Sequence, residues 1–279
     1  MRSLLKKMPL VRLALETRRR WHRLRFASSY YEPSVKAIFH WLRHSREDTN
    51  FTYDLLLLNR QQLAGLIALV TGKKIKEIEG YFSELDGNEG LRRHVIERTG
   101  QSVSAAQSDP HARYGRRLGW YALVRAAKPR TVVGTGVDKG FGTCVLAAAL
   151  LANAAEGFDG TYYGTDINPA AGYLFTAPYM QVGTLLYGDS IASLQGFSEP
   201  IDFFINDSDH SSEYEGREYQ TIRGKLSENA LILGDNSHVT SKLFEFARET
   251  GWQFVFFSEK PKDHWYPGGG IGIAFSGSR

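Results

Sequence analysis

Hydrophobic residues recur at helical spacing through the first part of the chain, and no strand-like alternation appears before residue 130. Residues 57–71 (LLNRQQLAGLIALVT) show this spacing, and Gly72 directly after them is suited to end a helix. Further helices are predicted at 33–46, 74–84 and 90–99. The polar stretch SVSAAQSDP at 102–110 predicts a boundary. We therefore expect an all-helical accessory region at residues 1–105, which covers a substrate site or forms a subunit interface.

From residue 131 the pattern changes to short apolar runs that alternate with helical segments. The strand-like runs are 131–135, 161–166, 182–187, 201–206, 230–234, 253–257 and 271–275. This alternation is typical of a doubly wound α/β domain, with a mostly parallel seven-stranded sheet and helices on both faces. The loop 259–270 is too short for a full helix, so the last strand is predicted to be antiparallel. This domain is expected to span residues 106–279 and to begin with a helix at 111–127.

Charge is distributed unevenly between these two parts. Residues 1–130 contain 25 Lys and Arg against 12 Asp and Glu, a balance of +13. Residues 131–279 contain 9 against 18, a balance of −9. An acidic sheet domain is suited to a cationic cofactor or a metal ion, and it argues against nucleic acid as a partner.

Residues 1–26 form a basic segment, with 9 Lys and Arg and a single acidic residue, Glu16, interleaved with leucines and aromatics. An amphipathic helix is predicted after Pro9. Such a helix is suited to peripheral contact with anionic lipid or with RNA. The alternative is a helix that packs on its own domain or on a partner subunit of a homo-oligomer.

The single cysteine, Cys144, excludes an internal disulfide and is typical of a reducing compartment. It lies at the start of an apolar helical run, which favours a packing role over a nucleophilic one. No apolar run reaches the roughly 18 residues that span a bilayer, and the basic N-terminus lacks the apolar core of a secretory signal. The sequence therefore predicts a cytoplasmic protein.

A glycine-rich turn follows the first predicted strand, in the stretch TVVGTGVDKGFGT at 131–143. Glycines allow the backbone to approach a ligand, and the following helix offers free N–H groups at its N-terminus. The spacing from Gly136 is G-x-x-x-G-x-G, which differs from the G-x-G-x-x-G of dinucleotide-binding proteins and makes an NAD-dependent oxidoreductase a poor interpretation. The turn indicates a nucleotide-like ligand, although a ligand-free glycine turn is the alternative.

Polar residues follow the next four predicted strands. They are Asp166; Asp189 and Ser190; Asp207 within NDSDH; and Asp235 with Asn236 within GDNSH. An acidic residue after the second strand is suited to accept hydrogen bonds from a ribose diol, and Asp189-Ser190 is suited to an adenine edge. Asp and Asn also cap helices and initiate turns, so each position alone has a structural alternative. Their order along the strands favours one binding site at the carboxyl edge of the sheet.

This series resembles the class I S-adenosylmethionine-dependent methyltransferases over about residues 113–277. It is most similar to the catechol O-methyltransferase type and its bacterial relatives, including macrolide-sugar O-methyltransferases. The Asp166-Ile167-Asn168-Pro169 stretch matches the family's acidic motif after the second strand. One position departs from the pattern, because Gly134 stands where the family has an acidic residue near the methionine part of the cofactor. Asp138 is the nearby carboxylate that could compensate.

The resemblance implies two sets of ligand-binding residues. The residues implied for S-adenosylmethionine are Gly134, Thr135, Gly136, Gly140, Asp166, Ile167, Asp189, Ser190 and Asp207. Those implied for Mg²⁺ or another divalent cation are Asp207, Asp235 and Asn236. Such an ion would lower the pKa of a bound acceptor hydroxyl and orient it for methyl transfer.

His210, three residues after Asp207, is the candidate general base, with a structural role as its alternative. His238 is the second choice, and His264 lies on a loop that either lines the acceptor pocket or forms a plain hairpin. The sequence therefore predicts metal-assisted O-methylation of a small hydroxylated molecule. The alternative is a methyltransferase-like domain that binds or scaffolds without turnover, which the Gly134 departure favours and the retained Asp207, Asp235 and Asn236 oppose.

Overall fold

The computed structural model describes residues 9–47, 49–235 and 237–277, with only the backbone for residues 9–12. The chain divides into two compact units. The larger unit comprises residues 46–262 and 268–279, and the smaller unit comprises residues 1–45 and 263–267.

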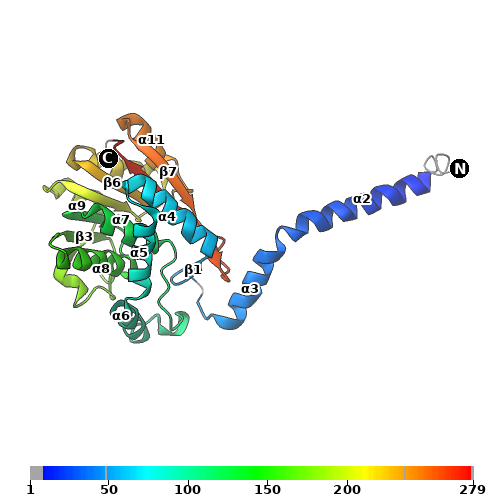
Figure 1. Ribbon diagram of the computed structural model, residues 1–279, viewed down its shortest axis with the longest axis horizontal. Coiled ribbons are helices and arrows are strands. Elements are labelled where there is room, and N and C mark those ends of the chain that lie inside the picture. Colours follow the sequence, from blue (N-terminus) through cyan, green and yellow to red (C-terminus); the bar gives the residue numbers. More distant parts are fainter. Residues whose placement is uncertain (1–8, 48, 236, 278–279) are drawn as a thin grey trace. The chain divides into compact units, whose positions relative to one another are not determined.

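The larger unit is built around a seven-stranded sheet with the strand order β4-β3-β2-β5-β6-β9-β7 (Figure 1). Its strands are β2 (Thr131–Thr135), β3 (Thr161–Asp166), β4 (Gly183–Tyr187), β5 (Ile201–Asn206), β6 (Leu226–Asp235), β7 (Gln253–Ser258) and β9 (Gly270–Phe275). Strands β2 to β6 are parallel, whereas β9 is antiparallel to both β6 and β7. The predicted fold class is confirmed, including the antiparallel last strand.

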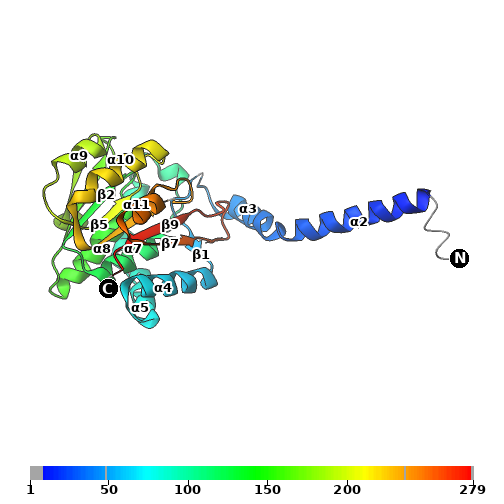
Figure 2. The same ribbon diagram turned by 90° about the horizontal axis from the view of Figure 1, so that it is seen from above.

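Helices cover both faces of this sheet (Figure 2). The helices of the larger unit are α4 (Leu57–Thr71), α5 (Ile75–Asp86), α6 (Glu89–Gly100), α7 (Arg117–Ala127), α8 (Phe141–Ala155), α9 (Ser190–Gly196), α10 (Ser212–Ile222) and α11 (Lys242–Thr250). Short 3₁₀ helices lie at Ala105–Gln107, Tyr179–Val182 and Arg223–Lys225. Helices α9, α10 and α11 pack together on one face, and α7 packs on α8 on the other.

The hydrophobic core follows from alternation along the strands. Val133, Phe204 and Ile232 lie in one buried cluster with Tyr219 of α10 and Phe246 of α11. Their neighbours in sequence point to the opposite face, because successive side chains of a strand alternate. Both faces are covered, so the central strands are apolar throughout.

Residues 46–105 belong to the larger unit, because α4 and α5 pack on α7, and α6 packs on α8. The division of the structure therefore falls after Ser45 rather than near residue 105. This part also contains a short strand that the helical pattern did not predict: β1 (Asp54–Leu55) pairs antiparallel with β8 (Pro261–Lys262). Gly72 ends α4 in the left-handed conformation, as its position predicted.

The smaller unit contains two helices, α2 (Pro9–Ser29) and α3 (Glu32–His44). Four apolar side chains of α3 form an exposed stripe at helical spacing, Val35, Ile38, Phe39 and Leu42, with exposed fractions of 44–63%. Within this unit, the Trp41 ring lies 6.0 Å from the Trp265 ring. Among the described residues, every helix is too short or too polar to cross a lipid bilayer.

Candidate active site

The glycine turn after β2 has a conformation that larger residues would not tolerate. Gly136 has φ +83°, and a Cβ on it would lie 1.9 Å from the Asp207 carbonyl oxygen. Gly140 precedes α8 with φ +91°, and a Cβ there would lie 3.1 Å from the Gly172 Cα. The turn is therefore packed closely against Asp207 at Gly136, and the first residues of α8, Phe141, Gly142 and Thr143, line a cavity beside it.

Asp166, at the end of β3, orders this turn. Its Oδ2 accepts hydrogen bonds from the backbone N–H groups of Val137 and Asp138, both at 2.9 Å. Its Oδ1 accepts one from the Asn168 N–H at 2.8 Å. A carboxylate has about four acceptor positions, so Asp166 keeps capacity for a further donor.

A cavity of about 500 Å³ lies at the carboxyl ends of β2, β3, β4 and β5. This volume is in the range of small-molecule sites. Six of the residues predicted to bind the cofactor line it, namely Gly136, Asp166, Ile167, Asp189, Ser190 and Asp207. Ile167 is 79% exposed, so an apolar side chain stands uncovered at this cavity.

A smaller cavity of about 220 Å³ adjoins the first, and the two share Gly136, Asp138 and Asp207. Three cationic side chains line the smaller one: Arg116, Arg117 and Lys139. The Arg117 guanidinium lies 4.8 Å from the Phe141 ring centroid, and its Nη1 donates to the Phe51 carbonyl at 3.1 Å. Burial, and then the positive charge of Arg116, lower the pKa of Arg117. The smaller cavity is thus suited to an anionic group.

Gly134 lies on the wall of the smaller cavity, and Tyr162 of β3 occupies the space beside it. A Cβ on Gly134 would lie 2.9 Å from the Tyr162 hydroxyl, which is hydrogen-bonded to Thr143 Oγ1 at 3.1 Å. The structure therefore explains the departure from the family pattern, because an acidic side chain at this position would collide with Tyr162. Asp138, the proposed substitute, lines both cavities.

Glu218, on α10, is a site residue that the sequence analysis missed. Its fully buried carboxylate accepts hydrogen bonds from the Thr135 hydroxyl at 3.2 Å and the Ser208 hydroxyl at 2.8 Å, and also from Ser190 and Asn206. Burial raises its pKa, and the hydroxyl donors oppose that effect. Glu218 thus ties together the ends of β2, β4 and β5.

Two of the residues predicted to bind the cofactor, Thr135 and Gly140, line neither cavity. Thr135 is fully buried, and its hydroxyl is used by Glu218. Asp189 caps α9 by accepting from the Ala192 N–H at 2.8 Å, and its other oxygen accepts from the Tyr214 hydroxyl at 2.9 Å. Asp189 therefore caps α9, as the structural alternative predicted, and it also lines the larger cavity.

His210 lines neither cavity but lies close to Asp207, which lines both. His210 Nε2 is 3.7 Å from Asp207 Oδ1, and both side chains are partly exposed. Burial, and then the neighbouring Asp235 carboxylate, raise the pKa of Asp207 well above its ordinary value. Burial also opposes ionisation of Asp235, but Arg116 outweighs it and holds the pKa of Asp235 below its ordinary value.

The residues predicted to hold a divalent cation do not fit one. Asp235 Oδ1 accepts from Arg116 Nε at 2.5 Å, and Oδ2 accepts from Arg116 Nη2 at 2.6 Å. Asn236 lies outside the described residues. Within the ranges that the structure describes, no three acidic, His or Cys side chains are grouped as metal ligands. We therefore derive no step of the reaction through Mg²⁺.

The other two candidate histidines lie elsewhere. His238 follows β6 and is exposed. His264 belongs to the smaller unit, where its ring lies 6.4 Å from the Trp41 ring and its Nδ1 accepts from the Tyr266 N–H at 3.1 Å.

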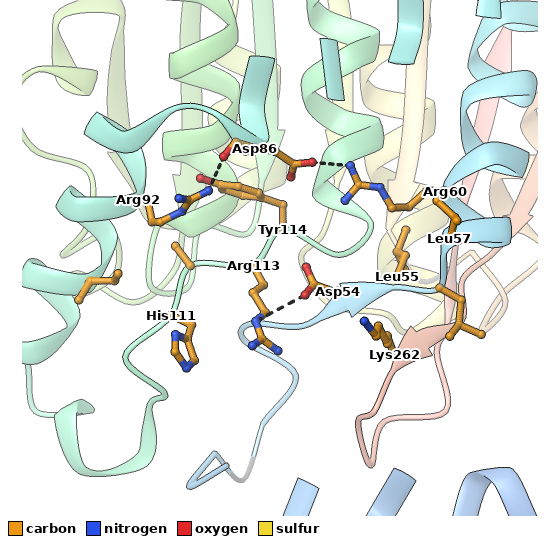
Figure 3. Close-up of a pocket in the computed structure, with 13 residues that line it drawn as sticks. Asp54, Leu55, Leu57, Arg60, Asp86, Arg92, His111, Arg113, Tyr114 and Lys262 are labelled. Atoms are coloured by element: carbon orange, nitrogen blue, oxygen red, sulfur yellow. Dashed lines mark hydrogen bonds and ion pairs between the residues drawn. The ribbon is translucent and has the colours of Figure 1, made fainter. Parts of the chain in front are cut away.

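A third cavity, of about 890 Å³, is a broad groove beside β1 and β8 (Figure 3). Its three arginines are paired with carboxylates: Arg60 with Asp86 at 2.5 Å, Arg92 with Glu89 at 2.5 Å, and Arg113 with Asp54 at 3.5 Å. It shares no lining residue with the two cavities at the strand ends. We therefore place the candidate active site at the strand ends.

The strand order, the glycine turn and the cavity at the carboxyl edge define the Rossmann-like fold of the class I S-adenosylmethionine-dependent methyltransferases. Residues 133–237 match a family model described as a methyltransferase domain. The matched segment, which is similar to methyltransferase domains, runs from within β2 to just beyond the end of β6. The resemblance predicted from the strand-end motifs is confirmed at this level.

Solved structures with a similar fold share little sequence with this chain. A proposed caffeoyl-CoA O-methyltransferase from Staphylococcus aureus is 12% identical with a TM-score of 0.50, covering 73% of this chain and 100% of its own. A methyltransferase from Geobacter sulfurreducens is 17% identical with a TM-score of 0.49, covering 70% and 95%. The O-methyltransferase TomG from Streptomyces achromogenes, in complex with S-adenosylmethionine, is 14% identical with a TM-score of 0.48, covering 68% and 90%. A search of curated protein sequences found no match.

Proposed function

We propose that the chain transfers the methyl group of S-adenosylmethionine to a hydroxyl group of a small molecule. The observation that carries this proposal is the cavity of about 500 Å³ in which the glycine turn, Asp166, Asp189 and Asp207 meet. The turn supplies backbone N–H groups, and the carboxyl groups suit a ribose and a sulfonium cation. Nucleic acid is not proposed as an acceptor.

The two adjoining cavities suit the two ends of the cofactor. In this proposal the adenosine lies in the larger cavity, with its ribose at Asp166 and its base between Ile167 and Asp189. The methionine part lies in the smaller cavity, with its carboxylate toward Arg117 and Lys139. Asp207 borders both cavities, so its carboxyl group would lie near the sulfonium.

His210 is proposed as the general base. It takes the proton of the acceptor hydroxyl, the acceptor oxygen bonds to the methyl carbon, and the carbon–sulfur bond breaks to leave S-adenosylhomocysteine. The nearby Asp207 would help to position the imidazole, since His210 Nε2 lies 3.7 Å from Asp207 Oδ1. A built-in base supports a hydroxyl acceptor, because an oxygen nucleophile must lose a proton whereas a neutral amine need not.

The alternative, a methyltransferase-like domain without turnover, rested on Gly134. It loses that support because Tyr162 fills the position beside Gly134 while the rest of the cavity remains open. The two proposals share cofactor binding and differ in turnover. Release of S-adenosylhomocysteine in the presence of a panel of hydroxylated acceptors distinguishes them.

Calorimetry of the full chain with S-adenosylmethionine and S-adenosylhomocysteine tests cofactor binding. Asp166→Ala should weaken both by roughly 30- to 1000-fold, because it removes charge-assisted hydrogen bonds worth about 2–4 kcal/mol. Asp159→Ala, an exposed aspartate before β3, is the matched control and should bind normally. Equal affinities for both variants would remove the assignment of Asp166.

We also propose an accessory role for the helices that precede the sheet domain. In α2, Leu13, Trp21 and Leu24 lie on one helical face and are 57–67% exposed. Arginines occupy much of the remaining surface of α2, which suits anionic lipid better than self-association.

Sedimentation with vesicles containing phosphatidylserine tests this contact. Trp21→Glu should reduce binding, whereas binding that is unchanged would leave an oligomer interface as the role of this segment. Residues 1–8 of the basic segment lie outside the described residues.

A further inference from the structure

The Arg116 guanidinium is buried beside Asp235, the last residue of β6. Its side chain is 5% exposed, and that of Asp235 is fully buried. The guanidinium contacts both oxygens of Asp235, through Nε at 2.5 Å and Nη2 at 2.6 Å. This two-point arrangement matches the planar fork of arginine to the carboxylate plane.

The opposite side of the guanidinium is also held. Nη1 donates to the Tyr53 hydroxyl at 2.8 Å and lies 3.5 Å from Glu259 Oε1. Tyr53 in turn donates to Glu259 Oε2 at 2.5 Å, and Glu259 Oε1 accepts from the Gly269 N–H at 2.9 Å. Arg116 is therefore fixed by groups from three separate parts of the chain.

A divalent cation would compete with Arg116 for the same carboxylates. The resemblance assigns the ion to Asp207 and Asp235. The guanidinium already holds both oxygens of Asp235, and Arg116 lines the same cavity as Asp207. To bind Asp235, the ion would have to displace a buried guanidinium and leave it without its partner, or else lie next to its positive charge. Both arrangements are costly in a buried site.

We propose that Arg116 permanently holds the place that the resemblance gives to a divalent cation, and that removal of its charge turns Asp207 and Asp235 into a cation site. One consequence is that methyl transfer needs no metal ion, and this rests on the proposed function. The other consequence, that Arg116 prevents cation binding at Asp207 and Asp235, does not depend on the proposed function. The two consequences are therefore tested by separate measurements.

The test for cation binding is titration of the full chain with Mn²⁺, followed by the electron paramagnetic resonance signal of the free ion. We expect no stoichiometric binding by the wild-type chain or by Arg116→Lys, which keeps the positive charge. Arg116→Gln should gain one Mn²⁺ with a Kd of about 10⁻⁴ to 10⁻³ M, and the double variant with Asp235→Asn should lose it again. Arg113→Gln, which removes an exposed arginine, is the control and should behave as wild type.

Two results overturn the proposal. One is a wild-type chain that binds one Mn²⁺ which Asp235→Asn abolishes. The other is a folded Arg116→Gln variant, judged by circular dichroism, that gains no Mn²⁺. If Arg116→Gln does not fold, the Mn²⁺ titrations of wild type and Asp235→Asn still test whether the natural chain holds an ion at Asp235. For methyl transfer, a rate unchanged by EDTA supports the proposal, and a rate lost in EDTA and restored by Mg²⁺ contradicts it. If no methyl transfer is found with any acceptor, the proposed function fails, and the Mn²⁺ titration still tests Arg116.

Discussion

The Glu218 carboxylate of α10 accepts a hydrogen bond from the hydroxyl of Ser190, the first residue of α9. Ser190 lines the larger cavity, so a residue that does not line the cavity fixes one that does. Because Glu218 also accepts from Thr135, Asn206 and Ser208, it determines the spacing of three strand ends.

Replacement of Glu218 should therefore impair both stability and cofactor binding. Glu218→Ala removes the acceptor of three buried donors and of the half-buried Ser208 hydroxyl, and we expect a loss of about 2–4 kcal/mol in the free energy of unfolding. Urea unfolding measures this loss. Glu213→Ala, an exposed glutamate in the first turn of the same helix, is the control. Equal stabilities of the two variants would show that Glu218 does not organise the strand ends.

Replacement of Arg117 should weaken binding of the methionine part of the cofactor without affecting its adenosine part. Arg117→Met keeps an apolar stem against Phe141 and removes the charge from the smaller cavity. We expect about 10- to 100-fold weaker binding of S-adenosylmethionine, because one charge-assisted contact to its carboxylate is lost. Binding of 5′-methylthioadenosine, which lacks that carboxylate, should be unchanged. Calorimetry with both ligands is the measurement, and equal weakening of both would contradict the placement of the methionine part.

His210→Ala should lower the rate of methyl transfer by roughly 100-fold or more while leaving S-adenosylmethionine binding intact, because a positioned base is lost. The rate is measured by single-turnover transfer of a radiolabelled methyl group to an acceptor. His238→Ala removes an exposed histidine at the neighbouring strand end and serves as the control. A rate loss in His238→Ala alone would move the role of base to His238.

Glu47 should make stability depend on pH. It is 1% exposed, and burial raises its pKa to about 7, against the opposing effect of the Thr52 and Asp109 N–H groups. Between pH 4.5 and about 7 the folded chain holds a proton on Glu47 that the unfolded chain releases. This contribution to the free energy of unfolding is present below pH 4.5 and is lost as pH rises through about 7.

The difference in unfolding free energy between wild type and Glu47→Gln isolates this effect, since other groups titrate in both chains. We expect the difference to change by roughly 1–3 kcal/mol between pH 5 and pH 8, with wild type losing stability as pH rises. Urea unfolding at the two pH values is the measurement, and a constant difference would contradict the assignment.

The periodicity of the sequence was enough to predict the sheet, because buried parallel strands are recognisable from local composition. Strands β2, β3 and β5 have the predicted limits, and Asp166, Asp189 and Asp207 line one cavity as the order of strand ends implied. The pairing of Asp235 with Arg116 was beyond such reasoning, because 119 positions separate the two residues in the sequence. Glu218 was missed for a related reason: its partners come from three strands, and spacing within one helix does not reveal them.

The position of β9 between β6 and β7 has a consequence for the order of folding. Strand β7 joins the sheet through β9, yet β9 is synthesised after it. The strands whose ends form the larger cavity, β2 to β5, and their neighbour β6 pair in parallel without β9. During synthesis, all strands of the cofactor-binding half of the sheet are therefore made before β9, the only strand among the described residues that pairs with β7 in this sheet. Strand β9 completes the sheet by pairing antiparallel with both β7 and β6, and the edge of β6 has no partner on that side until β9 is paired, which leaves it open to wrong pairing.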